Sequence, residues 1–268
     1  MPVIIETIDT RGVATLTLNR PERHNALDQT LVTEMIAALK RLDARPDVRI
    51  VVLAGAGHSF CAGGDIDRMK SVADGDPEEN RRDALLLAEL THRLDRLSKP
   101  TLAVVHGPAY GGGVGLVACC DIAIASQSAT FSLSEVRLGI TPSVVCPFVI
   151  RAIGARQARR YFVSAEVMFA ERAAEIGLVH EVVALSELIA LRDRIVDALL
   201  TGAPGAQAEA KVLSSYCEYR RIDDALARET AERLAARRAS PEGREGLSAF
   251  LEKRPPAWRR TRNDRDVS

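Results

Sequence analysis

The chain has 268 residues, of which 47% are hydrophobic and 27% are charged, so it is long enough to bury a substantial core and too apolar to be disordered. Its 36 lysines and arginines balance 36 aspartates and glutamates, and this zero net charge gives no reason to expect nucleic acid or an anionic membrane as a partner. The longest apolar stretch, residues 111–120, is about half the length of a membrane span. With five cysteines, no CxxC spacing and no signal-peptide pattern, we expect a reduced, soluble, cytoplasmic protein.

Strand-like and helix-like segments alternate along the first two thirds of the chain. Runs of β-forming or continuously apolar residues predict strands at residues 13–18, 50–54, 101–106, 121–125 and 129–133. Apolar residues at helical spacing predict helices at residues 27–42, 86–97 and 114–120, and composition predicts a polar loop at residues 71–80. Alternation of this kind is typical of an α/β fold with mostly buried strands.

The last part of the chain shows a different pattern. From about residue 185 it is helical to the end, with breaks at residues 202–204 and 240–241. No repeat of solenoid length is present in the sequence. We therefore predict an α/β core over residues 1–200 and a helical C-terminal region over residues 201–268.

Two glycine-rich turns follow buried strands, one at residues 60–66 and one at residues 110–115. Glycine lets the backbone approach a ligand, and a turn that opens a helix leaves amide N–H groups without helical partners. If the two turns converge, they supply two N–H donors to one oxygen. This is how a thioester carbonyl is stabilised as it becomes an enolate, at about 3–4 kcal/mol per donor. The alternative is that each turn only packs tightly.

Glu135 differs from the many glutamates on helical faces because it follows a short strand, among small and apolar neighbours. Partial burial of its carboxyl group disfavours the charged form, which suits acid–base catalysis. A structural role, either hydrogen-bonded or exposed, is the alternative for a glutamate at such a place.

Other chemistries find less support in the sequence. The histidines show no metal-ligand spacing and no GxSxG motif is present, so we expect neither a metal site nor a serine hydrolase of that type. Cys61 with His58 is a conceivable thiol nucleophile, but a space-filling thiol is the simpler interpretation. Residues 113–118 fit the GxGxxA dinucleotide motif, yet a stretch that includes Pro108 separates them from the preceding strand. A nicotinamide-dependent oxidoreductase is therefore the weakest alternative.

A set of motifs runs through these same positions. They lie at residues 19–27, 60–66, 99–101, 111–113, 120–125, 131–139 and 175–179. In this order and spacing they resemble the enoyl-CoA hydratase/isomerase family, also called the crotonase superfamily, from about residue 13 to residue 183 with a continuation to residue 258. The resemblance implies a crotonase-like spiral of ββα units with a helical C-terminal part used in trimer assembly. It also implies a homotrimer, or a hexamer built as a dimer of trimers.

The resemblance also implies roles for particular residues. By position, the amides of Gly64 and Gly112 form an oxyanion hole. The residues implied to line or flank the channel for the adenine and pantetheine of CoA are Ala62, Gly63, Asp65, Ile66, Arg23 and Ala26. The expected partner is an acyl-CoA substrate, and because CoA is part of that substrate no separate cofactor is expected. No role is assigned to His106, for which a hydrogen-bonding core residue is the simplest interpretation.

This chain departs from the family pattern at one catalytic position. Typical hydratases of the family carry two glutamates; here the first position is Gly115, and only the second, Glu135, is present. We therefore expect Glu135 to perform a syn addition alone, accepting a proton from water and delivering one to the α-carbon. We expect Gly115 to lie beside the bound substrate and to leave space there for a water molecule or a bulkier acyl group. A single glutamate also suits a Δ3–Δ2 enoyl-CoA isomerase, and its missing partner suits a non-catalytic acyl-CoA-binding homologue.

A finer similarity favours hydration. Residues 112–116, 133–142, 147–150 and 152–154 are similar to bacterial methylglutaconyl-CoA hydratases, including the missing first glutamate. The implied reaction is the reversible hydration of 3-methylglutaconyl-CoA to 3-hydroxy-3-methylglutaryl-CoA in leucine or acyclic terpene breakdown. Its substrate carries a distal carboxylate, for which Arg137 and Arg68 are candidates, with a surface role as the alternative for each.

Overall fold

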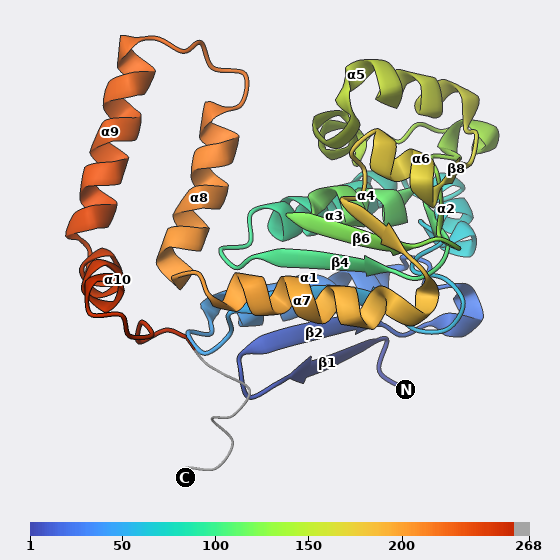
Figure 1. Cartoon of the computed structure of the whole chain (residues 1–268). Helices are drawn as coiled ribbons and strands as arrows, with labels where there is room; N and C mark the ends of the chain where they lie inside the picture. Colours follow the sequence, from blue (N-terminus) through green and yellow to red (C-terminus); the bar gives the residue numbers. More distant parts are fainter. Residues whose placement is uncertain (260–268) are drawn as a thin grey trace.

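The computed structural model describes residues 1–259, whose strands form two sheets. The strands are β1 (Ile4–Ile8), β2 (Val13–Leu18), β3 (Ile50–Gly55), β4 (Thr101–Val105), β5 (Ala109–Tyr110), β6 (Ile122–Ser126), β7 (Thr130–Ser132), β8 (Met168–Phe169) and β9 (Glu181–Val183). A six-stranded sheet has the order β1-β2-β3-β4-β6-β9, in which β1 is antiparallel to β2 and the other neighbouring pairs are parallel (Figure 1). The strands β5, β7 and β8 form a small second sheet.

Several helices of the described part begin at recognisable sequence signals. The helices of this part are α1 (Gln29–Ala44), α2 (Ile66–Ala73), α3 (Pro77–Asp95), α4 (Gly112–Cys119), α5 (Cys146–Ser164), α6 (Ala170–Glu175), α7 (Leu188–Leu200), α8 (Pro204–Cys217), α9 (Asp224–Ala239) and α10 (Pro241–Leu251). Asp28, Asp65 and Asp76 accept hydrogen bonds from first-turn amides of α1, α2 and α3. These caps satisfy donors that have no partner within the helix.

The central strands are buried on both faces, which explains their continuous apolar sequence. In β3, Val51 and Leu53 belong to the larger core cluster, which includes residues of α1, α3 and α4. Ile50 and Val52 belong to a smaller cluster that α7 completes on the other face, where Figure 1 shows α7 lying along the sheet. Because successive side chains of a strand point to opposite faces, a strand covered on both sides needs apolar residues at every position.

Residues 203–251, which contain α8, α9 and α10, form an arm whose first two helices project from the core (Figure 1). Neither α8 nor α9 contains a buried residue. Arg49 is 5% exposed and donates hydrogen bonds to the carbonyl oxygens of Gly202 (2.7 Å) and Trp258 (2.8 Å), just outside the two ends of the arm. Lys211 of α8 pairs with Asp121 of the core at 2.7 Å. The base of the arm is therefore fastened to the core.

The predicted α/β class is confirmed, and each strand and helix predicted from the sequence in the first two thirds of the chain is present. The polar loop predicted at residues 71–80 is wrong over most of its length, because α2 continues to Ala73 and α3 begins at Pro77. Asp76 caps α3, and proline is well suited to the first helical position. The boundary at residue 200 stays a prediction, and residues 260–268 of the predicted helical region lie outside the described residues.

Candidate active site

Both glycine-rich turns open onto one cavity of about 590 Å³. Its lining comes from α1, α2 and α3 together with residues of the segment 134–145. The predicted site residues that line it are Ala62, Gly63, Gly64, Ile66, Gly112 and Glu135. The structure thus brings the two turns and the candidate acid to one place.

The first turn leaves the Gly64 amide without a protein acceptor. The Leu27 amide donates to the Gly63 carbonyl oxygen (2.7 Å), and the Asp65 amide donates to the Leu27 carbonyl oxygen (3.1 Å). The Gly63 C=O and the Gly64 N–H belong to one trans peptide group and point in opposite directions, so the N–H of Gly64 points away from Leu27. Within residues 1–259 it donates no hydrogen bond to another protein atom.

The second turn presents the Gly112 amide in a similar way. Gly112 is the first residue of α4, so its N–H has no partner within the helix. Gly111 has a φ of +48° and Gly63 a φ of +90°, conformations that side chains disfavour. A Cβ on Gly63 would lie 2.8 Å from the Tyr110 carbonyl oxygen and 3.3 Å from the Gly112 nitrogen. The absence of a side chain therefore allows the two turns to meet.

The Glu135 carboxyl group lies beside the second turn. Glu135 begins the 3-10 turn Glu135–Leu138, shortly after β7. Its Oε1 is 3.1 Å from the position of a Cβ on Gly111, and its Oε2 is buried without a hydrogen-bond partner among the described residues. Burial raises the pKa of Glu135, and a hydrogen bond from its own amide only partly opposes this. The cavity therefore holds an acid with a free oxygen next to two free amides.

Two other carboxylates line the cavity, but the protein itself engages each of them. Asp28 caps α1 and pairs with Arg20 at 3.2 Å. Asp83 accepts a hydrogen bond from the Arg68 guanidinium at 2.9 Å. Among the described residues of the cavity, Glu135 is thus the acid with a buried oxygen that has no hydrogen-bond partner.

Arg23, Ala26 and Asp65 do not line this cavity, although the resemblance assigns them to the CoA channel. Asp65 is 7% exposed, caps α2 and pairs with Arg20 at 3.2 Å. Burial acts to raise the pKa of Asp65, but hydrogen bonds from the Arg68 amide and the Arg20 guanidinium hold it below its ordinary value. The Asp65 side chain therefore fixes the start of α2, and contact of these three residues with CoA stays a prediction.

The structure corrects the expectation at Gly115. This residue is buried in α4 and is not part of the cavity lining. A Cβ at position 115 would overlap the Val145 side chain, lying 2.7 Å from Val145 Cβ. The prediction that Gly115 leaves space for a water molecule or a bulkier acyl group is wrong, because Val145 fills that space.

The two arginines considered for a distal carboxylate both have protein partners. Arg137 donates a hydrogen bond to the Ala165 carbonyl oxygen at 2.8 Å and does not line the cavity. Arg68 lines the cavity but pairs with Asp83 at 2.9 Å and with Glu79 at 3.0 Å. Arg68 is therefore already paired with two acids, whereas the printed partner of Arg137 is a neutral carbonyl oxygen.

Of the remaining sequence candidates, Cys61 and the glycines of the GxGxxA motif are buried, whereas His106 is half-buried. Cys61 is fully buried, and burial raises the pKa of its thiol to about 12, which makes it a poor nucleophile. Gly113 and Gly115 of the GxGxxA motif are buried inside α4 and form no open phosphate-binding turn. The His106 ring hydrogen-bonds the Gly57 carbonyl oxygen through Nε2 at 2.9 Å.

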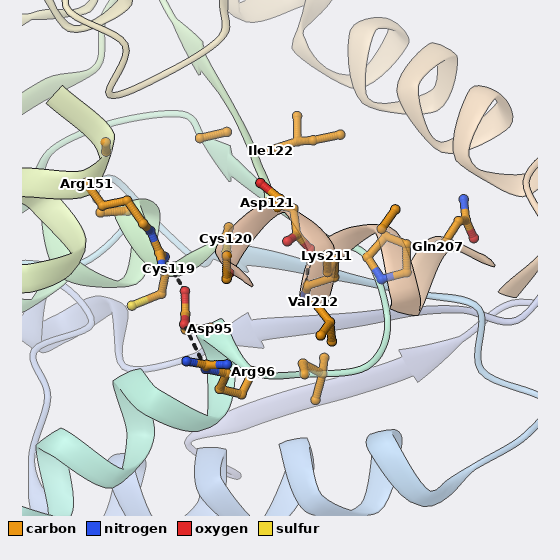
Figure 2. A pocket seen from close by; sticks show the side chains of 18 of the residues that line it. Asp95, Arg96, Cys119, Cys120, Asp121, Ile122, Arg151, Gln207, Lys211 and Val212 are labelled. Carbon is orange, nitrogen blue, oxygen red and sulfur yellow. Dashed lines mark hydrogen bonds and ion pairs between the residues drawn. The ribbon is translucent and has the colours of Figure 1, made fainter. Parts of the chain in front are cut away.

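A larger cavity of about 1000 Å³ lies between α8 and the core (Figure 2). Figure 2 shows its charged side chains in pairs, with Arg151 reaching Asp95 and Lys211 beside Asp121. Burial raises the pKa of the Cys120 thiol to about 12, so this cysteine is not an activated nucleophile. We therefore place the candidate active site in the smaller cavity.

Sequence reasoning missed the apolar wall of the candidate active site. Its members are Leu27, Val32, Met69, Val72, Leu86, Leu87 and Val145. Apolar residues at helical spacing predict burial, but nothing in their pattern separates those that face a cavity from those that face the core.

Within residues 1–259, no group of three or more His, Cys, Asp or Glu side chains is placed to hold a metal ion. No described helix is both long enough and apolar enough to span a bilayer.

Comparison with known proteins identifies the family. The sequence model of the family described as enoyl-CoA hydratase/isomerase matches residues 9–261. The chain belongs to the enoyl-CoA hydratase/isomerase family. A short-chain-enoyl-CoA hydratase of Clostridium acetobutylicum is 36% identical over 90% of this chain and 92% of its own. Mevalonyl-coenzyme A hydratase sidH of Aspergillus fumigatus is 32% identical over 93% of this chain and 92% of its own.

Solved structures of the enoyl-CoA hydratase/isomerase family share this fold. The crystal structure of an enoyl-CoA hydratase from Shewanella pealeana matches with a TM-score of 0.92 and 42% identity, over 96% of each chain. The predicted crotonase-like α/β fold is therefore confirmed. Membership of this family also supports an acyl-CoA substrate and enoyl-CoA hydratase activity.

Proposed function

We propose that this family member hydrates a short enoyl-CoA thioester, with Glu135 as its one acid–base group. The observation that carries the proposal is the buried, unpartnered Oε2 of Glu135 in a cavity shared with two free amides. In this proposal the thioester carbonyl oxygen binds between the N–H groups of Gly64 and Gly112. The Glu135 carboxyl group beside these amides then transfers the protons needed at the α-carbon and β-carbon of the substrate.

The proposed addition needs one proton carrier. Glu135, as a carboxylate, accepts a proton from water while the water oxygen adds to the β-carbon. The electron pair of the double bond moves onto the thioester as an enolate, whose oxygen the amides stabilise by about 3–4 kcal/mol each. Protonated Glu135 then delivers its proton to the α-carbon, so one water has been added and the carboxylate is restored. A raised pKa makes Glu135 the stronger base that the first transfer needs.

The apolar lining of the cavity favours an uncharged acyl group. Its α1–α3 side is lined by apolar residues such as Val32 and Val72, and the arginine there, Arg68, is already paired with two acids. For 3-methylglutaconyl-CoA, Arg68 would have to exchange an acidic partner for the substrate carboxylate. We therefore propose a short uncharged enoyl-CoA as the first candidate substrate and 3-methylglutaconyl-CoA as the second.

The variant Glu135→Gln tests the proposal. Because glutamine keeps the shape but cannot carry the proton, we expect kcat/KM for crotonyl-CoA hydration to fall by about 10²–10⁴-fold, the usual contribution of general acid–base catalysis. The loss of absorbance of the conjugated thioester gives the rate, and a panel of short, branched and carboxylated enoyl-CoAs ranks the substrates. Glu34→Gln, at an exposed glutamate of α1, is the matched control and should keep wild-type activity. Wild-type hydration by Glu135→Gln would refute the proposal.

A Δ3–Δ2 enoyl-CoA isomerase is the second candidate function, because the single free acid also suffices to move a proton between two carbons. A 3-enoyl-CoA in isotopically labelled water separates the two activities. An isomerase shifts the double bond without placing labelled oxygen in the product, whereas a hydratase produces labelled hydroxyacyl-CoA. A homologue that binds CoA esters but exchanges no α-proton with solvent would be a non-catalytic binder.

A further inference from the structure

The α4 face next to the active-site cavity is covered by two side chains from residues 134–145. Gly111 is the N-cap residue of α4 and Gly115 lies in the first turn, where its amide donates to the Gly111 carbonyl oxygen at 3.2 Å. Glu135 Oε1 lies 3.1 Å from the position of a Cβ on Gly111, and Val145 Cβ lies 2.7 Å from the position of a Cβ on Gly115. The acid therefore lies against the N-cap of α4 and the valine against its first turn.

Val145 is held firmly in this place. It is 3% exposed and is the N-cap residue of α5, whose first amides it anchors. Its carbonyl oxygen accepts hydrogen bonds from the amides of Phe148 and Val149, both at 3.1 Å. Moving the valine away would disturb the start of α5, so with Val145 present no side chain fits at position 115.

The Val145 side chain itself offers no hydrogen-bonding group, and the nearby hydroxyls of the cavity lining, Ser134, Thr141 and Ser143, carry no charge. The other charged residues of the described cavity lining are Asp28 before α1, Arg68 on α2 and Asp83 on α3, and each is held in an ion pair. A water molecule near the Gly115 turn of α4 would therefore meet methyl groups rather than a second acid. Glu135 is then the acid of the described lining that offers the reacting water a buried oxygen without a partner.

We propose that Val145 is a positioning residue: it occupies the place of a side chain at position 115 and keeps water off this part of α4, so that Glu135 is the acid that holds the reacting water. This inference rests on the proposed hydration. Gly115 and Val145 then act as a pair, in which the missing side chain on α4 is compensated by one from the start of α5. The substitution of one member without the other disturbs both the packing and the water at the acid.

A thermodynamic cycle over Gly115→Ala and Val145→Gly tests the pairing. With Val145 present, Gly115→Ala should lower the Tm by about 5 °C because an overpacked core is strained. With glycine at 145 the nearest atom is Val145 Cα at 3.8 Å, and alanine should then raise the Tm by about 2 °C because it favours the helix. This reversal of sign is the expected result, measured by thermal unfolding. A Gly115→Ala effect of the same sign in both backgrounds would overturn the pairing.

The pH profile of hydration tests the exclusion of water. Glu135 must be ionised to accept a proton from water, so kcat/KM falls as the pH drops through its pKa. Val145→Gly admits water beside the acid and should move this acidic limb to lower pH. Val145→Thr keeps the shape but adds a hydroxyl group, and it should move the limb in the same direction even if Val145→Gly folds poorly. An unmoved limb in the folded variants would overturn the proposed role.

The two experiments also separate this inference from the proposed function. If the wild-type protein hydrates enoyl-CoA but the variants show no reversal of sign, the pairing is refuted and the proposed function stands. If the variants show the reversal but the wild-type protein hydrates no enoyl-CoA, the proposed function is refuted, together with the water-excluding role of Val145.

Discussion

Glu135 links the proposed activity of this chain to its stability. Burial raises the carboxyl pKa, so the folded state binds the proton more tightly than the unfolded state does. Below the ordinary value of 4.5 both states are protonated, and the group costs the fold nothing. As the pH rises through 4.5 toward the raised pKa, the unfolded state releases its proton first and the free energy of unfolding falls.

Glu135→Gln should therefore be more stable than the wild type at neutral pH, because an amide carries no charge to desolvate. The Tm difference should be largest at neutral pH and should vanish at about pH 4 and below, where the wild-type carboxyl group is protonated in both states. Thermal unfolding across this pH range measures it, with Glu34→Gln as a control that should show no such trend. A difference that grows toward acid pH would contradict this sign.

Local signals allowed part of the site to be predicted. Glu135 stands out as an acid after a short strand, and the glycine turns at Gly64 and Gly112 stand out by composition. The position of Val145 could not be predicted, because its role comes from contact with Gly115 in a distant segment and a valine in an apolar stretch has no signal of its own. Asp65 lies inside a glycine motif, yet sequence position does not say which way a side chain points.

At the scale of elements, α2 depends on its cap. Asp65 accepts hydrogen bonds from the amides of Asp67 and Arg68 and pairs with Arg20, and the helix that it starts places Ile66 along the cavity. The predicted polar loop at residues 71–80 shows the converse case. Its acids and proline proved to be the starting signals of α3, because the residues that interrupt one helix also begin the next.

Asp65→Ala should destabilise the fold by about 1 kcal/mol through loss of the cap, which corresponds to about 2–4 °C in Tm. It should also raise KM for enoyl-CoA, because α2 forms part of the cavity wall. Asp223→Ala is the matched control: Asp223 caps α9 on the arm and does not line the cavity. This control should show a similar loss of stability with an unchanged KM. An unaltered Tm in Asp65→Ala would show that the cap contributes nothing.

At the scale of the whole molecule, the arm exposes much apolar surface. Ile222 is 92% exposed, Phe250 82% and Leu251 80%, and a cavity of about 1000 Å³ lies between α8 and the core. Surfaces of this kind commonly mark contacts between proteins. The sequence predicted the helices of the arm from their pattern, but such a pattern does not say what a helix packs against.

We expect the chain to assemble into the trimer or hexamer that its family resemblance implies, with the arm at the contacts between subunits. Light scattering coupled to gel filtration should give a mass of three or six times 29.1 kDa. A dilution series is the control for weak association. A mass near that of one chain at every concentration would contradict the expectation.

The hydrogen bonds of Arg49 at the base of the arm have a consequence for proteolytic cleavage of the chain. Arg49 binds the carbonyl oxygens of Gly202 and Trp258, and the Trp258 indole N–H donates to the Thr201 carbonyl oxygen at 3.0 Å. The segments that lead into and out of the arm are thus joined by side-chain hydrogen bonds to one another and to Arg49, the residue before β3. If a protease cut the link between α8 and α9, the two fragments would still be held together, because Gly202 of one and Trp258 of the other both accept hydrogen bonds from the Arg49 guanidinium.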